Sequence, residues 1–111
     1  AGGALDYAGI TMDTTAHRVT RDGQAVPLGP TEFRLLRHFL EHPGRVFSRE
    51  QLLDAVWGRD VYVEQRTVDV HIRRLRKAVN STAGTEELPD VIRTVRSAGY
   101  ALDADPVLVR A

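Results

Sequence analysis

The chain has 111 residues, 42% of them hydrophobic and 27% charged, which predicts one small globular domain over residues 1–111. Its 15 basic residues balance 15 acidic ones, which argues against a general polyanion coat, and the absence of cysteine excludes disulfides and thiolate metal sites. No apolar run is long enough to span a membrane and no signal-peptide pattern opens the chain, so we expect a cytoplasmic protein without a membrane partner.

The first quarter of the chain shows the short alternating patterns of β-strands, at residues 10–13, 18–21 and 24–28. Asp22 and Gly23 both tolerate a positive φ, so they predict a tight hairpin turn between the last two strands. We therefore expect a small antiparallel sheet here, and its residues suggest no chemistry.

Two helices are predicted next, and each has a recognisable start. The first follows Gly29, because Pro30 fits the first position of a helix. The second follows Ser48, which forms a capping box with Gln51, and ends near residues 57–58. The first helix has a continuous apolar stripe that we expect to be buried: Phe33, Leu35, Leu36, Phe39 and Leu40.

Residues 65–79, QRTVDVHIRRLRKAV, are the most informative segment of the chain. At about 100° per residue, a helix places one apolar stripe toward a core: Val68, Ile72, Leu75 and Val79. Its opposite face carries four cations around one apolar side chain: Arg66, Val70, Arg73, Arg74 and Lys77. Residues 65–80 hold five basic side chains and one acidic, a net charge of +4, whereas a solvated surface helix usually mixes both signs. This pattern is typical of a helix that enters the major groove of DNA.

Residues 80–90 are polar and contain glycine and proline, which predicts a surface loop. A β-hairpin follows at 91–102, with its turn at 96–99 and with Gly99 available for a positive φ. The order of sheet, helix pair, basic helix and hairpin predicts an α+β winged helix-turn-helix that binds DNA.

Three stretches resemble the DNA-binding effector domain of OmpR/PhoB-family response regulators, above all its phosphate-regulon activators: GPTEFRLLRHFLEHPGRVFSREQLLDAVWG, VYVEQRTVDVHIRRLRKAV and IRTVRSAGYAL. The resemblance implies a four-stranded antiparallel N-terminal sheet, three helices and a C-terminal hairpin wing. It implies a head-to-tail dimer on double-stranded direct-repeat promoter DNA, with residues 65–79 in the major groove and the wing, residues 91–102, in the minor groove. It also implies control of phosphate-regulon genes and activation by the protein's own receiver domain, which we expect to lie outside this chain.

Carried onto this sequence, the resemblance makes Arg74 the best candidate for reading a base. The other DNA contacts that it implies on the third helix are Arg66, Thr67, Val70, His71, Arg73, Arg76 and Lys77. Arg76 lies about two helical turns after Asp69, so an intrahelical ion pair is as good an interpretation as a phosphate contact. For His71, packing or phosphate binding is favoured over metal binding, because no second ligand is spaced with it.

In the hairpin, the resemblance makes Arg96 a minor-groove or phosphate contact, favoured by narrow A·T-rich grooves, and Thr94 a phosphate or sugar contact. An ordinary exposed arginine is the alternative for Arg96. Many family members have glycine at the position of Ser97, which leaves the geometry of the turn open. Tyr100 is expected to support the hairpin rather than to contact DNA.

The loop between the second and third helices matches the transactivation loop of the family. The residues expected there to contact RNA polymerase sigma factor are Trp57, Gly58, Val63 and Gln65. Burial of Trp57 as an anchor of the second helix is an equal alternative. Close relatives often have an acid at the position of Gln65. If that acid contributes to the polymerase contact, we expect the contact of this protein to differ from theirs.

An enzyme is not expected, because no nucleophile triad, carboxylate pair or phosphate-binding loop is assembled, and neither a cofactor nor a metal is expected. Two alternatives use the same fold. One is a winged helix that binds only proteins, which the outward cations disfavour. The other is the effector domain of a membrane-linked one-component regulator.

Overall fold

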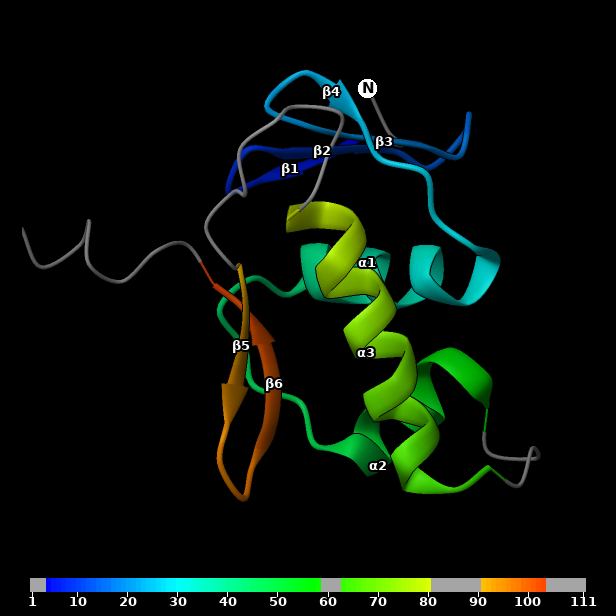
Figure 1. The fold of residues 1–111 in the computed structure, drawn as a ribbon, viewed down its shortest axis with the longest axis vertical. Helices are drawn as coiled ribbons and strands as arrows, with labels where there is room; N and C mark the ends of the chain where they lie inside the picture. Colours follow the sequence, from blue (N-terminus) through cyan, green and yellow to red (C-terminus); the bar gives the residue numbers. More distant parts are fainter. Residues whose placement is uncertain (1–3, 59–62, 81–90, 104–111) are drawn as a thin grey trace, which may run out of the picture.

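A computed structural model describes residues 4–58, 63–80 and 91–103 (Figure 1). The elements follow in the order β1 (Ala4–Tyr7), β2 (Ile10–Asp13), β3 (Arg18–Arg21), β4 (Gln24–Ala25), α1 (Pro30–Glu41), α2 (Arg49–Leu52), the π-helical turn η1 (Leu53–Trp57), α3 (Gln65–Asn80), β5 (Ile92–Val95) and β6 (Gly99–Leu102). This order confirms the predicted α+β winged helix. The predicted surface loop after α3 and the chain beyond Asp103 lie outside the described residues.

The four N-terminal strands form one antiparallel sheet in the order β1-β2-β3-β4. The predicted hairpin turn between β3 and β4 is confirmed, with φ of 49° at Asp22 and 86° at Gly23. Strand β4 ends at Ala25, two residues before Pro27, which has no backbone N–H to give to a ladder. One face of the sheet is buried and includes the side chains of Ile10 and Met12. Helix α1 packs near this sheet.

Helices α1 and α3 pack together and supply nearly half of the buried core residues. The predicted stripe of α1 is buried along its whole length, and the four predicted core residues of α3 are at most 1% exposed. The start signals also hold, because Gly29 caps α1 with Pro30 in its first turn. The hydroxyl of Ser48 accepts from the Gln51 N–H, and the Gln51 side chain accepts from the Ser48 N–H.

The second helix differs from the prediction in its last turn, which is π-helical over Leu53–Trp57. The Gly58 N–H donates to the carbonyl of Leu53 at 3.0 Å, and Gly58 leaves the helix with a φ of 92°. The ring of Trp57 then lies 5.4 Å from that of His71 on α3. Nothing in the periodicity of the sequence distinguishes this turn from an ordinary α-helical one.

Strands β5 and β6 form the predicted hairpin, which we call the wing. The wing is held to the α1–α2 connection by two backbone hydrogen bonds between Phe47 and Tyr100, of 2.8 and 2.9 Å. Gly99 has a φ of 139°, and a Cβ there would lie 1.9 Å from the Phe47 carbonyl oxygen. Ser97 has a φ of 66°, so the serine adopts the conformation that glycine favours. No described helix is both long and apolar enough to cross a membrane.

Candidate nucleic-acid interface

The outward side of α3 carries an exposed group of side chains that we call the basic face: Arg66, Val70, Arg73, Arg74 and Lys77. Val70 is 45% exposed and stands among these cations as the one exposed large hydrophobic residue of the described chain. Among the described residues, no hydrogen bond or ion pair engages Arg73, Arg74 or Lys77. Arg66 pairs with Glu64 at 3.2 Å, but both side chains are largely exposed, so this pair is weak. The basic face therefore has donors available for an external anion.

A cluster of three polar side chains connects the wing to the N-terminal half of α3. The Tyr100 hydroxyl donates to Asp69 Oδ1 at 2.5 Å, and Arg49 Nε donates to the same oxygen at 2.7 Å. The Arg49 guanidinium also lies 5.5 Å from the centre of the Tyr100 ring. These contacts join α2, α3 and β6, so Tyr100 has the supporting position predicted for it.

The electrostatics of this cluster favour the charged form of Asp69. Burial alone would raise the pKa of Asp69, but hydrogen bonds from Tyr100 and Arg49 outweigh it and hold the pKa below its ordinary value. Burial and the bond to Asp69 raise the pKa of the Tyr100 phenol. The phenol thus remains a donor and the carboxylate remains an acceptor at neutral pH.

Arg76 joins α3 to the wing from another side. Its Nη2 donates to the Ile92 carbonyl at 2.8 Å and to Thr94 Oγ1 at 2.9 Å. Asp69, considered above as its ion-pair partner, bonds instead to Arg49 and Tyr100. The structure therefore gives Arg76 a wing-supporting role that was not predicted.

His71 and Glu32 form a polar contact between α3 and α1. His71 Nδ1 lies 2.5 Å from Glu32 Oε2, with the side chains 19% and 9% exposed. Burial would raise the pKa of Glu32, but the hydrogen bond to His71 and nearby charges, including Arg74, lower it. His71 is therefore placed as a packing histidine. No local signal in the sequence could pair Glu32 with His71, because the two residues lie 39 positions apart.

The remaining predicted site residues are distributed over three places. Thr67 is half-buried at the start of α3, while Thr94 and Arg96 are exposed on the wing. In the loop, Trp57 is half-buried against the core, as the anchor interpretation expects, and Val63 is half-buried. Gln65 is exposed at the first position of α3. Residues 59–62 of the predicted transactivation loop lie outside the described part of the chain.

A cationic helix, backed by an apolar stripe and flanked by a hairpin with an exposed turn, defines the chain as a winged helix-turn-helix domain of the DNA-binding class. Residues 23–102 match the family model described as transcriptional regulatory protein, C terminal. The chain belongs to this family, and it is the DNA-binding domain of an OmpR/PhoB-type transcriptional regulator.

The relatives agree in sequence and in fold. The chain is 60% identical over 95 residues to the phosphate regulon transcriptional regulatory protein PhoB of Rhizobium meliloti, and the match covers 86% of this chain and 40% of that protein. It therefore spans about 40% of the length of such relatives. The DNA-binding domain of Escherichia coli CadC gives a TM-score of 0.80 at 30% identity, with 92% of both chains covered. The Klebsiella pneumoniae RstA DNA-binding domain, solved in complex with the RstA box, gives 0.75 at 31% identity and covers 90% of this chain and 96% of that one.

Proposed function

We propose that this domain binds direct-repeat promoter DNA as a head-to-tail pair. The basic face of α3 lies in the major groove and the wing lies in the adjacent minor groove. The observation that carries the proposal is the basic face itself, because Arg73, Arg74 and Lys77 are exposed and make no hydrogen bond or ion pair with the described residues. A charged group that a protein leaves without an internal partner is available to phosphates and base edges.

Within this face, each residue type fits a different DNA group. Arg74 has the planar guanidinium that pairs with guanine O6 and N7, and Val70 suits the methyl group of thymine. Arg66, Arg73 and Lys77 surround them and fit phosphates. Thr67 and His71 lie at the edge of the face, and Thr94 and Arg96 extend the contact through the wing. Arg76 supports the wing through Ile92 and Thr94, and any phosphate contact that it makes is additional to these bonds.

The relatives support a particular regulatory setting. The similarity to PhoB favours control of phosphate-regulon genes in the cytoplasm, within a longer protein whose receiver domain governs this one. The exposed Gln65 and the nearby Trp57, Gly58 and Val63 form the surface proposed for sigma factor. A DNA-binding role of this kind needs no catalytic group.

The test is selection of tight-binding duplexes from a random pool by the purified domain at moderate salt. The proposal expects two direct repeats about one helical turn apart, with A·T-rich steps beside each. Binding without sequence enrichment would reduce the interface to phosphate contacts. Absence of binding even at low salt would favour a winged helix that binds proteins.

The polymerase contact needs a separate experiment in the full-length protein. Gln65→Ala is expected to lower transcription from a promoter that carries the selected repeats, while the affinity for that DNA stays unchanged. Equal transcription by both proteins would remove Gln65 from the polymerase surface. The same promoter should respond to phosphate limitation if the regulatory assignment is correct.

A further inference from the structure

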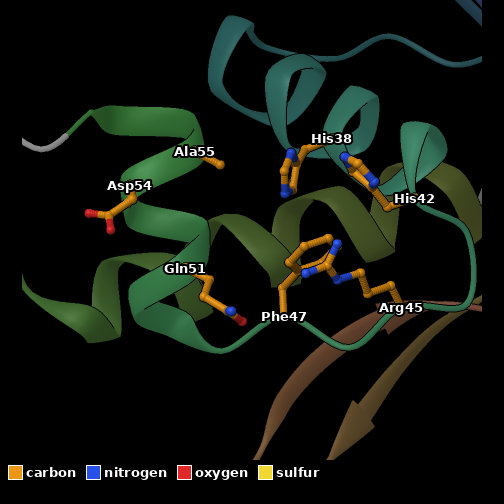
Figure 2. A pocket seen from close by; sticks show the side chains of 7 residues that line it. All are labelled: His38, His42, Arg45, Phe47, Gln51, Asp54 and Ala55. Carbon is orange, nitrogen blue, oxygen red and sulfur yellow. The ribbon is translucent and has the colours of Figure 1, made fainter.

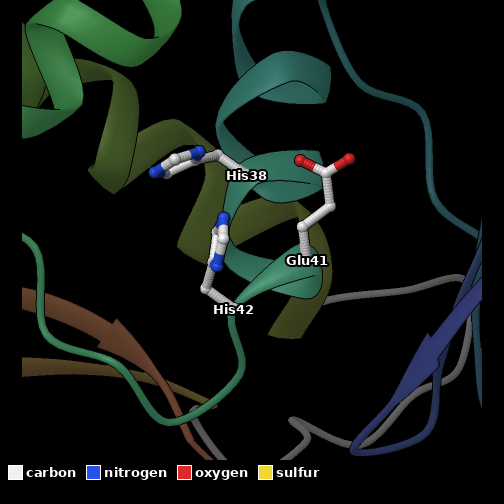
Figure 3. A group of neighbouring side chains, drawn as sticks. All are labelled: His38, Glu41 and His42. Atoms are coloured by element: carbon white, nitrogen blue, oxygen red, sulfur yellow. The ribbon is translucent and has the colours of Figure 1, made fainter.

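The last turn of α1 carries a group of potential metal ligands that the DNA interface does not use. His38, Glu41 and His42 each offer one ligand atom, and these atoms all lie within 4.8 Å of one another (Figure 3). The two imidazole rings are 5.1 Å apart between centroids. We propose that these three side chains bind a divalent transition-metal ion of the zinc, nickel and copper class.

The spacing suits such an ion. His38-Phe39-Leu40-Glu41-His42 has the His-x-x-Glu-His pattern that places two imidazoles on one zinc in helical peptidase sites. Imidazole nitrogen suits zinc, nickel and copper, and a carboxylate can complete a three-ligand site with water in the fourth position. Here the pattern supplies ligands and no peptidase activity is proposed, since Glu41 would bind the ion itself.

The ligand atoms need only a small adjustment to reach bonding geometry. Tetrahedral zinc with bonds of about 2.0–2.1 Å holds its ligand atoms about 3.4 Å from one another. Glu41 and His42 are exposed, so rotation about their side-chain bonds can close the present separation without moving the core. His38 is half-buried, and its ring lies 4.4 Å from that of Phe47, which limits its rotation. One ligand is therefore held in place and two can adapt.

An open space lies beside the two rings. A cavity of about 390 Å³ is lined by both histidines together with Phe47, Gln51 and other residues, and the rings project from α1 toward it (Figure 2). The volume exceeds that of several water molecules, about 30 Å³ each, so a hydrated ion can enter. Entry therefore requires no opening of the hydrophobic core.

The charges around the site both favour and oppose a cation. The site lies at the C-terminal end of α1, where the helix dipole is negative, and His42 is the C-cap residue. Arg45 stacks on Phe47 at 5.2 Å and opposes the ion, whereas Asp54 lines the far side of the cavity and favours it. Glu41 pairs with Arg37 at 3.4 Å, but both side chains are exposed, so an ion can displace this weak pair.

The test is calorimetric titration of the untagged domain with zinc chloride in a buffer that does not chelate metals. The expected result is saturable binding of one ion per chain. His42→Gln should weaken it by at least about tenfold, since loss of a direct ligand should cost no less than loss of a supporting one. Nickel should bind the same site and copper should bind it more tightly. Glu41→Gln should have a smaller effect in the same direction.

The matched control is His17→Gln. His17 is also an exposed histidine beside an aromatic ring, stacked on Phe33 at 4.6 Å, but it lies outside the group. Its substitution should leave zinc affinity unchanged. Equal loss in His17→Gln and His42→Gln, or unchanged affinity in His42→Gln, would overturn the proposal.

Folding is checked separately from metal binding. His38→Gln changes a half-buried side chain, so its effect on metal binding would be mixed with an effect on folding. The exposed His42 therefore provides the deciding variant. Zinc should raise the Tm of the wild-type domain by more than that of His42→Gln, while both proteins retain the same DNA affinity. A rise in Tm of equal size in both proteins would place the ion elsewhere.

Discussion

The charged residues of α3 fall into two groups that differ in their partners. On the basic face, Arg73, Arg74 and Lys77 are exposed and make no hydrogen bond or ion pair with the described chain. On the flanks, Asp69, His71 and Arg76 each bond to a different element. Electrostatics explains the difference, because half-buried charges need partners and exposed ones do not.

Two arginines close together in α3 show that position on the helix decides which charged residues have partners. Arg74 and Arg76 are two positions apart and have the same side chain, yet one points to solvent and the other reaches the Ile92 carbonyl. The flanking contacts fix the position of the wing and of α1 relative to α3. The basic face can then meet DNA on a helix that is already oriented, which reduces the ordering cost of binding.

Gly99→Ala is expected to be the substitution that most strongly disrupts the attachment of the wing. A Cβ at Gly99 would lie 1.9 Å from the Phe47 carbonyl oxygen and 2.6 Å from the Phe47 carbonyl carbon, which are backbone atoms that cannot rotate away. Strain at a positive φ of 139° adds to this clash. We expect a loss of about 3 kcal/mol or more in the free energy of unfolding, measured by urea denaturation.

Gly23→Ala is the matched control for that substitution. Gly23 has a φ of 86°, but no atom lies within 4 Å of the position that a Cβ would occupy. Only the conformational strain applies, so a loss of about 1 kcal/mol is expected. Similar losses in the two variants would show that the wing is not rigidly held against Phe47.

Arg74→Ala tests the basic face. We expect a loss of about 1–3 kcal/mol in binding to the selected DNA site, with a relaxed preference at one base pair. Arg34→Ala on α1 removes another exposed arginine, one that lies outside the basic face, and should change neither quantity. Affinity and base preference are measured by fluorescence anisotropy on a set of single-base variants of the site. Uniform weakening on every duplex would make Arg74 a phosphate contact.

Asp69→Asn tests a flank contact through pH. Because the folded-state pKa of Asp69 is lowered from 3.8, its carboxylate stabilises the fold above about pH 4, and this stabilisation is lost as the pH falls through the lower, folded-state value. We expect the variant to lose about 1 kcal/mol at pH 7, because Asp69 is 37% exposed and solvent screens its bond to Arg49. The difference between the two proteins in urea denaturation should shrink as the pH falls below about 4 and through the folded-state pKa.

Comparing the wild-type protein with Asp69→Asn separates the contribution of Asp69 to stability from those of other acids. Glu32 also has a lowered pKa, and its contribution is present in both proteins, so it cancels in the comparison. A difference that does not shrink as the pH falls would mean that Asp69 acts through packing and that its charge is unimportant.

Local signals in the sequence predicted most of the fold. The Gly29-Pro30 start, the Ser48–Gln51 capping box and the turn at Asp22 all depend on residues within a few positions of one another. The division of α3 into a buried stripe and an outward face depends only on helical periodicity. These features needed no knowledge of how the elements pack.

The contacts that position the site could not be predicted in this way. Glu32–His71 and Tyr100–Asp69 join residues 39 and 31 positions apart, and each requires the tertiary packing first. The π-helical turn at Leu53–Trp57 has no distinct periodic pattern. The proposed metal site differs from the expectation of no metal, and the i, i+4 spacing of His38 and His42 is the local signal in the sequence that bears on it.

Arg96→Ala should have the smallest effect and the most specific one. Arg96 is exposed at the wing turn, so its substitution leaves the fold intact and removes one charge from the DNA contact. We expect a loss below about 1 kcal/mol, measured by anisotropy and confined to sites with A·T-rich flanks, because a narrow minor groove concentrates negative potential. Duplexes with G·C-rich flanks and the same repeats provide the control. Equal loss on both would make Arg96 an ordinary phosphate contact. Loss only on A·T-rich flanks would support a minor-groove contact by Arg96, carried by a wing that the contacts of Arg76 and Tyr100 hold against α3.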